Sequence, residues 1–224
     1  MSKAPLLTIR QLGIADYLPV YHAMRDFTAQ RQPDQPDELW LLQHPSTFTR
    51  GLNSRSENLL NPGSIPVVAV DRGGDVTYHG PGQWVLYLLV DLRRRHLGIR
   101  DFVTLMETGV LNLLASEKIP AHARPEAPGV YVANRKIASL GLRVRRQGCY
   151  HGLSLNVAMD LTPYQRINPC GYAGLKVTDM QQEGSQLSFA QIGEALLHHT
   201  IDLLSRHPAT TPTTPAEVAD HHES

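Results

Sequence analysis

Cys170 is the residue of this chain best suited to act as a nucleophile. It lies in the segment Ile-Asn-Pro-Cys-Gly-Tyr-Ala-Gly at 167–174, with proline before the thiol and glycine after it. Turn-forming residues on both sides favour a thiol that is exposed to solvent over one that is buried in the core. A reactive thiolate needs that exposure. From this one thiol alone, an inert loop cysteine is an equally good interpretation.

Lys136 is the second residue with chemical potential. The chain has only four lysines, and this one begins the apolar stretch 137–144 directly after Asn134 and Arg135. A lysine at a strand end is usually a solvated edge residue. Beside a thiol and partly desolvated, it would stabilise a thiolate when charged and act as a base when neutral. The spacing does not by itself bring the two side chains together.

Two histidines, His79 and His151, are each followed by glycine. Either one could orient a carbonyl group or assist proton transfer, and either one fits equally well as a hydrogen-bonded buried histidine. Cys149, His151 and Cys170 show neither C-x-x-C nor H-x-x-x-H spacing, so we expect no metal site.

The stretch 72–83, Arg-Gly-Gly-Asp-Val-Thr-Tyr-His-Gly-Pro-Gly-Gln, contains four glycines and a proline. Such a composition predicts a loop with sharp turns and close backbone approaches. The apolar runs 66–70 and 84–90 on either side predict buried strands that hold this loop. Neither G-x-G-x-x-G nor the P-loop pattern is met, so the common phosphate cradles are not supported.

The bulk composition sets the class of protein. The chain has 224 residues, 42% of them apolar, and a net charge of zero on 21 basic and 21 acidic residues. This balance argues against bulk binding to nucleic acid or to anionic membranes. The first residues contain no secretory h-region, the longest apolar run is too short to span a bilayer, and two cysteines make no disulfide framework. We therefore expect a cytoplasmic protein with free thiols.

The remaining pattern predicts a series of short strands and three helices. Asp16 is expected to cap a helix to about residue 31, Asp101 a helix to about 117, and Ser188 with Gln191 a capping box that opens a helix to about 206. The predicted strands are 6–10, 38–43, 66–70, 84–90, 121–124, 129–133, 136–144 and 149–157. A polar loop is expected at 49–63, and Asn134 with Arg135 forms a two-residue hairpin connection.

Hairpin-like clusters of strands favour an α+β fold, with a mixed, largely antiparallel sheet and packed helices. No linker divides residues 1–207, which we expect to form a single catalytic domain. The Pro/Thr-rich segment 208–224 has no apolar face and is expected to be disordered.

Four segments in order resemble one family. They are the glycine-rich stretch 72–83, Lys-Ile-Ala-Ser-Leu-Gly at 136–141, Tyr-His-Gly-Leu-Ser-Leu-Asn at 150–156 and Asn-Pro-Cys-Gly at 168–171. Together they are similar to the octanoyltransferase (lipoyl/octanoyl transferase) family of lipoic-acid biosynthesis, over about residues 39–180.

The resemblance implies a fold related to the biotin/lipoate protein ligase catalytic domain. It also implies transfer of an octanoyl group from acyl carrier protein to a lysine on a lipoyl domain, through a cysteine thioester. The acceptors would be 2-oxo acid dehydrogenase subunits and the glycine-cleavage H protein. The family requires no metal, nucleotide or other cofactor.

The resemblance also assigns roles to residues. Cys170 matches the acyl-carrying cysteine, and Lys136 matches the lysine that activates it and serves as acid and base. The segments that match acyl-substrate binding comprise Arg72, Gly73, Gly74, Asp75, Val76, Thr77, Tyr78, His79, Ser139, Leu140, Gly141, Gly152, Leu153 and Ser154. At Asp75 and Ser154 other residues are common in relatives. We expect Tyr78, Leu140 and Leu153 to wall an apolar channel for the octanoyl chain.

The second half of this reaction needs a base, because the acceptor lysine is charged at neutral pH. Lys136 suits that role if burial lowers its pKa. Carrier proteins and lipoyl domains are typically acidic, and the basic runs 93–95 and 143–146 are possible contact surfaces.

Three other functions compete with the transferase. An ATP-dependent lipoate or biotin ligase shares the fold but has no obligatory thiol. A non-catalytic acyl-binding module would retain its activity after Cys170→Ser. A thiol hydrolase would release octanoate at a rate unaffected by an acceptor domain.

Overall fold

A computed structural model describes residues 7–145 and 148–210, and its centre is one large mixed sheet. This main sheet has the order β1-β2-β6-β10-β9-β8-β7, with β11 paired to β9. Its strands are β1 (Leu7–Ile14), β2 (Asp37–Gln43), β6 (Gln83–Leu89), β7 (His122–Ala123), β8 (Gly129–Val132), β9 (Arg135–Arg145), β10 (Gly148–Asn156) and β11 (Lys176–Val177). Among the described strands of this main sheet, β1–β2 and β9–β11 pair in parallel and the other pairs are antiparallel, so the predicted largely antiparallel α+β fold is confirmed.

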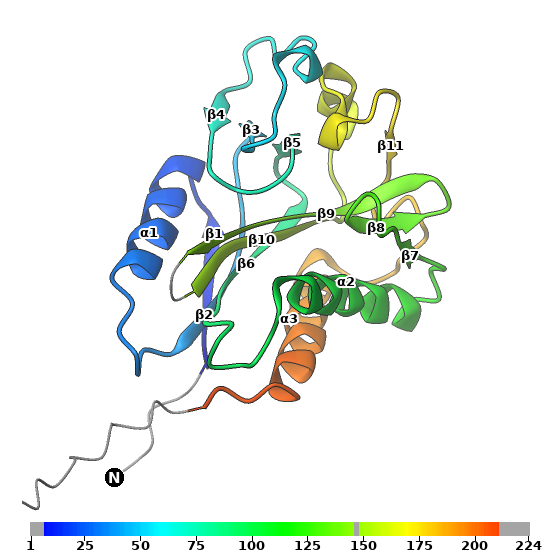
Figure 1. The fold of residues 1–224 in the computed structure, drawn as a ribbon. Coiled ribbons are helices and arrows are strands. Elements are labelled where there is room, and N and C mark those ends of the chain that lie inside the picture. The colour runs from blue at the N-terminus through cyan, green and yellow to red at the C-terminus, as the bar shows by residue number, and fades with distance from the viewer. Residues whose placement is uncertain (1–6, 146–147, 211–224) are drawn as a thin grey trace, which may run out of the picture.

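A smaller sheet lies to one side of the main sheet (Figure 1). It consists of β3 (Thr47–Arg50) between β4 (Val67–Ala69) and β5 (Val76–His79). Its own core is formed by Phe48, Val76 and Tyr78 with Tyr164 and Ile167. The small sheet therefore carries the glycine-rich stretch over one face of the main sheet.

Alternation along β6 explains how the two faces of the main sheet are covered. Leu86 and Leu88 point to a core that includes helices α2 (Ile99–Ser116) and α3 (Phe189–Ser205). Val85 and Tyr87 point to the opposite face, which helix α1 (Tyr17–Ala29) covers. Figure 1 shows α2 and α3 together below the sheet and α1 away from them. A period of two along a strand produces this two-sided burial.

Several predicted boundaries are confirmed and others are wrong. The capping box of α3 is present, with the Gln191 N–H donating to Ser188 Oγ at 3.3 Å. Asp16 occupies the N-cap position of α1, without a side-chain capping bond. Helix α2 begins after Gly98, so Asp101 lies in its first turn and is not its cap. The hairpin turn between β8 and β9 is Ala133 and Asn134, one residue earlier than predicted.

The glycine-rich stretch and its flanks also differ from expectation. Residues 76–79 form β5, and the predicted polar loop at 49–63 includes the end of β3 and a short 3₁₀ helix at Ser56–Asn58. The strand predicted at 66–70 exists as β4, but Val67 and Ala69 are exposed on it. It is an edge strand of the small sheet, which leaves one face in solvent.

The basic run 93–95 is not a docking patch, because two of its arginines are buried. Asp37 is fully buried and accepts hydrogen bonds from Arg31, from Arg94 at 3.0 Å and from Arg95 at 2.6 Å. Arg95 also donates to the carbonyl groups of Leu204 and His207. We call Asp37 with its three arginines the Asp37 cluster; it fastens the start of β2 to the end of α3.

The expected disordered tail begins inside the described residues. Ala209 is buried and the Thr210 N–H donates to the Arg94 carbonyl at 2.9 Å, so 208–210 pack on the domain. Residues 211–224 lie outside the described part, as does residue 146 of the basic run 143–146. The single-domain assignment to 1–207 stays a prediction.

Candidate active site

Cys170 and Lys136 meet in the structure, 34 residues apart in the chain. The Nζ atom of Lys136 lies 3.0 Å from the Sγ atom of Cys170 and also donates to the Pro128 carbonyl at 3.0 Å. Lys136 comes from β9 and is only 2% exposed, whereas Cys170 is partly exposed on a 3₁₀ turn, Pro169–Gly171. A thiol within hydrogen-bond reach of an ammonium group is the usual arrangement of an activated cysteine.

The backbone of the 3₁₀ turn is what presents the thiol. Cys170 has a φ of 57°, and Gly171 follows with a φ of 81°. Side chains other than glycine rarely adopt this left-handed region, so the surrounding contacts must hold it. The Asn168 N–H donates to the Asn58 carbonyl at 2.8 Å, and Asn58 Nδ2 donates to Asp75 Oδ2 at 2.6 Å. The thiol loop is therefore attached to the glycine-rich stretch.

The charge state of Lys136 follows from its neighbours. Burial alone lowers the pKa of Lys136, but the negative form of Cys170 and the nearby Tyr131 raise it by more, so the net pKa is raised. The expectation of a lowered pKa is not met while the thiol is free. In this state Lys136 is an ammonium group and can donate a proton.

A narrow inner cavity extends from Cys170 across the main sheet. It has a volume of about 40 Å³ and passes from β9 over β10 to Val85 and Tyr87 on β6. Eleven residues of the predicted substrate-binding segments line it: Arg72, Gly74, Asp75, Thr77, His79, Ser139, Leu140, Gly141, Gly152, Leu153 and Ser154. The structure thus brings three separate sequence segments around one cavity.

Three residues of the predicted binding segments do not line this inner cavity. Val76 and Tyr78 point to the other face of β5, where they pack with Phe48 in the small core. Gly73 borders a second cavity instead. The expectation that Tyr78 walls the channel beside Leu140 and Leu153 is therefore wrong, and Thr77 and His79 take that place by strand alternation.

Aromatic side chains form the far wall of the inner cavity. Tyr17 from α1 stacks on His79, with ring centroids 5.6 Å apart, and Tyr87 lies edge-on to His151 at 6.2 Å. His79 Nδ1 donates to Gln83 Oε1 at 2.8 Å, and burial lowers the pKa of His79 to about 3. Burial lowers the pKa of His151 as well. Both histidines are therefore neutral near pH 7, as expected for buried, hydrogen-bonded side chains.

His151 is held by Asp71, whose carboxylate lies 3.3 Å from its Nε2 atom and also accepts from the Tyr150 hydroxyl. If Nε2 carries the proton, Nδ1 is left as the acceptor. Nδ1 has no hydrogen-bond partner among the described residues.

A second, outer cavity also borders Cys170. It has a volume of about 330 Å³ and is mostly apolar, lined by Ile99 and Val103 of α2, Pro128, Leu142 and Tyr172 among others. Lys136, Leu140, Gly141 and Cys170 border it. Cys170 and Leu140 line both cavities, so the thiol stands at the junction between a surface opening and an interior slot.

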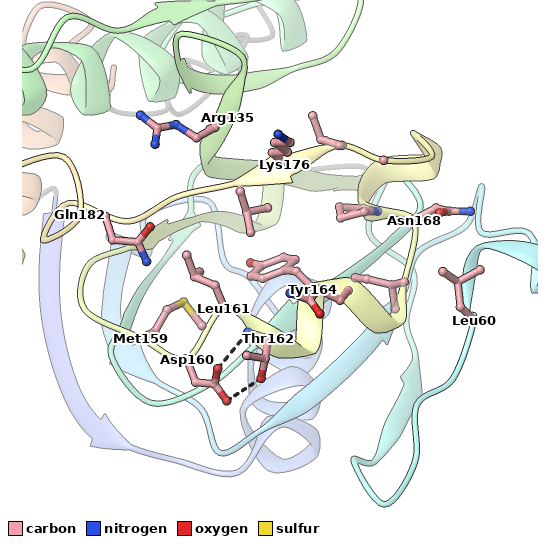
Figure 2. A pocket seen from close by; sticks show the side chains of 16 residues that line it. Leu60, Arg135, Met159, Asp160, Leu161, Thr162, Tyr164, Asn168, Lys176 and Gln182 are labelled. Atoms are coloured by element: carbon pink, nitrogen blue, oxygen red, sulfur yellow. Dashed lines mark hydrogen bonds between the residues drawn. The ribbon is translucent and has the colours of Figure 1, made fainter.

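A wider groove of about 770 Å³ lies behind the thiol loop and does not contain Cys170 (Figure 2). Figure 2 shows Arg135 and Lys176 along one side and the segment from Met159 to Tyr164 along the other. Pro169 and Asn168 border it, but neither Cys170 nor Lys136 lines it, so the size of a cavity does not by itself identify the candidate site.

Several residues that shape the site could not be identified from the sequence. Asn58 lies in a polar loop, and Tyr17 and Tyr87 read as ordinary apolar positions of a helix and a strand. For Gly129 the sequence did offer a signal, because Pro128 followed by Gly129 is a typical turn pair. In the structure, a Cβ at Gly129 would lie 2.4 Å from Cε of Lys136. Cys149 is fully buried and burial raises its pKa to about 12, so it offers no competing nucleophile.

The described residues contain neither a metal-binding group nor a membrane-spanning helix. Among residues 7–145 and 148–210, no three His, Cys, Asp or Glu side chains are grouped so as to hold a metal ion. No helix in this part of the chain has the length and apolar content needed to cross a membrane.

Comparison with known proteins identifies the family of this chain. Residues 17–201 match the lipoyl protein ligase A/B catalytic domain. The chain is 55% identical over 192 residues to an octanoyltransferase of Azotobacter vinelandii, covering 85% of this chain and 88% of that one. It is 53% identical over 207 residues to an octanoyltransferase of Pseudomonas fluorescens, covering 92% and 96%.

The fold has solved counterparts. A putative lipoate protein ligase of T. acidophilum with bound lipoic acid superposes with a TM-score of 0.72 at 14% identity, covering 88% of this chain and 85% of that chain. This likeness confirms the predicted lipoate-ligase type of fold. The chain belongs to the octanoyltransferase family, within the lipoyl protein ligase A/B catalytic domain family, and is an acyltransferase.

Proposed function

We propose that this protein transfers an octanoyl group from octanoyl-acyl carrier protein to a specific lysine of apo-lipoyl domains, through a thioester on Cys170. The contact of 3.0 Å between Lys136 Nζ and Cys170 Sγ, at the junction of two cavities, is the observation that carries the proposal. A reactive thiol needs a neighbouring proton donor and acceptor, and Lys136 can act as both.

The first step is thioester exchange. Cys170 Sγ attacks the carbonyl carbon of the donor, a C–S bond to Cys170 forms, and the C–S bond to the carrier's thiol breaks. The leaving thiolate takes a proton from the Lys136 ammonium group. One thioester replaces another, so the step is close to balanced in free energy.

The second step depends on a change at Lys136. Once Cys170 carries the acyl group, its negative charge is gone, and with it a main cause that raises the pKa of Lys136. Burial, which lowers the pKa of Lys136, then has the larger influence, and the neutral amine of Lys136 is favoured. The acceptor lysine loses one proton to solvent and attacks the Cys170 thioester as an amine. Lys136 takes the second proton as the C–N bond forms and the C–S bond breaks, which restores the thiolate and the ammonium group.

The two cavities suit the two parts of the substrates. We assign the inner cavity to the octanoyl chain, since the segments that resemble acyl-binding motifs line it. Its volume of about 40 Å³ is smaller than an eight-carbon chain, so side chains such as Leu140 must shift as the chain enters. The outer cavity leads from the surface to Cys170 and suits the pantetheine arm of the donor and the acceptor lysine in turn.

Lipoyl domains of 2-oxo acid dehydrogenase subunits and the glycine-cleavage H protein are the proposed acceptors, and the place of reaction is the cytoplasm. No cofactor is required by this chemistry, because the donor thioester already carries the free energy of the transfer. An ATP-dependent ligase of the same fold would need none of the Cys170 geometry.

Intact-protein mass spectrometry after mixing with octanoyl-acyl carrier protein tests the proposal. We expect an octanoyl adduct on wild type and on Cys149→Ser but not on Cys170→Ser. The adduct should discharge onto an added apo-lipoyl domain without ATP. An adduct that persists in Cys170→Ser would overturn the thioester mechanism, and transfer that requires ATP would favour the ligase. Release of free octanoate unaffected by the acceptor would favour a hydrolase.

A further inference from the structure

Glu107 is a buried carboxylate on α2 that takes no part in the proposed transfer. It is 9% exposed, and its Oε1 atom accepts a hydrogen bond from the Gly129 N–H at 2.8 Å. Burial raises its pKa, while the Gly129 N–H and the nearby Lys136 oppose that shift. A carboxylate is rarely kept inside a protein unless its contacts matter.

The hydrogen bond from Gly129 fixes a short loop at one end. At the other end, the Tyr131 hydroxyl donates to the Ala127 carbonyl at 2.8 Å. Pro128 lies between the two fixed residues and has no N–H of its own. Its carbonyl group accepts from Lys136 Nζ at 3.0 Å. The loop 127–129 thus positions the Lys136 ammonium group, and the loop is itself held by hydrogen bonds to Glu107 and from Tyr131.

Gly129 also touches the lysine directly. Its φ is 142°, and an added Cβ would lie 2.4 Å from Lys136 Cε and 3.0 Å from Nζ. The stem of Lys136 therefore runs against the bare backbone that Glu107 holds. A shift of the Gly129 backbone toward this stem would therefore displace the ammonium group from Cys170.

We propose that Glu107 is a positioning residue, which sets the Lys136–Cys170 distance by holding the loop 127–129. This inference rests on the proposed role of Lys136 in the transfer. The ionisable groups that face Lys136 are Cys170 on its loop, Tyr131 on β8 and Glu107 on α2. Glu107 acts through the hydrogen bond to Gly129, so an uncharged acceptor at 107 should serve almost as well.

Two substitutions separate this role from a structural one. Glu107→Leu keeps the volume of the side chain next to the apolar Met106 and Val110 of α2, and it removes the acceptor. Glu107→Gln keeps an acceptor for the Gly129 N–H. Glu117, at the end of the same helix, accepts from Ser185 Oγ at 2.9 Å, far from the site in the fold, and Glu117→Leu is the matched control.

The measurement is the rate of iodoacetamide alkylation of Cys170 against pH, together with the rate of octanoyl-adduct formation. We expect Glu107→Leu to move the alkylation midpoint upward by about one pH unit, as loss of a neighbouring cation does. Adduct formation at pH 7 should fall about tenfold, with Glu107→Gln restoring most of it and Glu117→Leu unchanged.

An alkylation profile of Glu107→Leu that coincides with wild type would overturn the positioning role, whatever the change in melting temperature. Failure of the proposed function has a different signature: wild type would form no octanoyl adduct, while the alkylation midpoint still shifted in Glu107→Leu. If Glu107→Leu does not fold, Gly129→Ala displaces the same lysine and must give the same upward shift.

Discussion

Asp75 stands against Gly171, the residue that follows the nucleophile. A Cβ built on Gly171 would lie 3.0 Å from Asp75 Oδ2, an oxygen that already accepts from Asn58 at 2.6 Å. The carboxylate therefore fills the space beside the thiol loop, and glycine is the residue that leaves room for it.

This contact predicts the effect of Gly171→Ala. The φ of 81° strains any L side chain by about 1–2 kcal/mol, and the methyl group would also push against Asp75. We expect octanoyl-adduct formation to fall by a factor of ten or more. Gly174→Ala is the matched control, since Gly174 has a φ of 72° but nothing within 4 Å of its Cβ position. Similar melting temperatures with different adduct rates would support the assignment, and equal rates would refute it.

The second prediction concerns Lys136→Met, which keeps the unbranched stem and removes the ammonium group. A proton donor and acceptor contributes about 10²–10⁴-fold to a rate, so both adduct formation and discharge to an acceptor should fall by at least 100-fold. The alkylation midpoint of Cys170 should rise, because the neighbouring cation is gone. Lys176→Met on β11, an exposed lysine, should behave as wild type. Adduct formation at the wild-type rate in Lys136→Met would contradict the mechanism.

The third prediction is a loss of stability at mildly acid pH. His44 is fully buried between the Ala15 carbonyl and the Tyr87 hydroxyl, and burial lowers its pKa from 6.5 to about 4. The unfolded chain takes up this proton near pH 6.5 and the folded chain does not until about pH 4. Stability is therefore present above pH 6.5 and is lost as pH falls toward 4, by about 2 kcal/mol between pH 7 and pH 5.

Urea unfolding at pH 7 and pH 5 measures this effect. His79, whose pKa is lowered to about 3, adds to the loss over the same range. His44→Gln should reduce the pH dependence, whereas His22→Gln, on the exposed side of α1, should leave it as it is. A wild-type stability that is the same at both pH values would show that the buried histidines do not stay neutral in the folded state.

The fourth prediction concerns the Asp37 cluster. Asp37→Ala leaves Arg31, Arg94 and Arg95 buried without their shared carboxylate, and breaking a buried ion pair costs about 3–5 kcal/mol. The urea midpoint should fall accordingly, without a direct effect on alkylation of Cys170 in the folded protein. Asp202→Ala removes the exposed pair with Arg206 and should cost less than about 1 kcal/mol. Equal losses from the two substitutions would contradict the account.

The sequence predicted well where one local cause decides the structure. Apolar periodicity identified the main strands and the three helices, and the Ser188–Gln191 pair fixed the start of α3. Boundaries failed where two causes compete. Asp101 is a good cap by type, but Gly98 is the N-cap and the helix begins at Ile99, so Asp101 lies in the first turn, where its charge suits the helix N-terminus.

Long-range contacts account for most of the differences. Arg94 and Arg95 look solvated until Asp37, which lies 57 and 58 residues earlier in the chain, is placed against them. Residues 76–79 look like loop because four glycines surround them, yet pairing with β3 makes them a strand. That pairing turns Tyr78 away from the cavity, a one-residue alternation that composition cannot reveal.

The pairing of Cys170 with Lys136 was expected from the family resemblance, whereas the residues that hold the two in place were not predicted. Residue spacing gave no reason to connect Lys136 with Cys170 before the fold did so. Asn58, Glu107 and Gly129 act through backbone atoms of other segments, and such contacts leave no pattern along the chain.

The thiol and the ammonium group belong to parts of the chain that are synthesised at different times. Lys136 lies on β9, whereas Cys170 follows β10 on the loop at 168–171, which is bonded to Asn58, so the pair can form only after both segments have been made and packed. A nascent or partly unfolded chain therefore carries Cys170 without the neighbouring ammonium group, and we expect its thiol to react only as fast as an ordinary cysteine. Labelling of Cys170 at its Lys136-assisted rate requires the finished domain, whereas Cys149 is buried there and becomes accessible on unfolding. The ratio of the two labelling rates is therefore a measure of native structure.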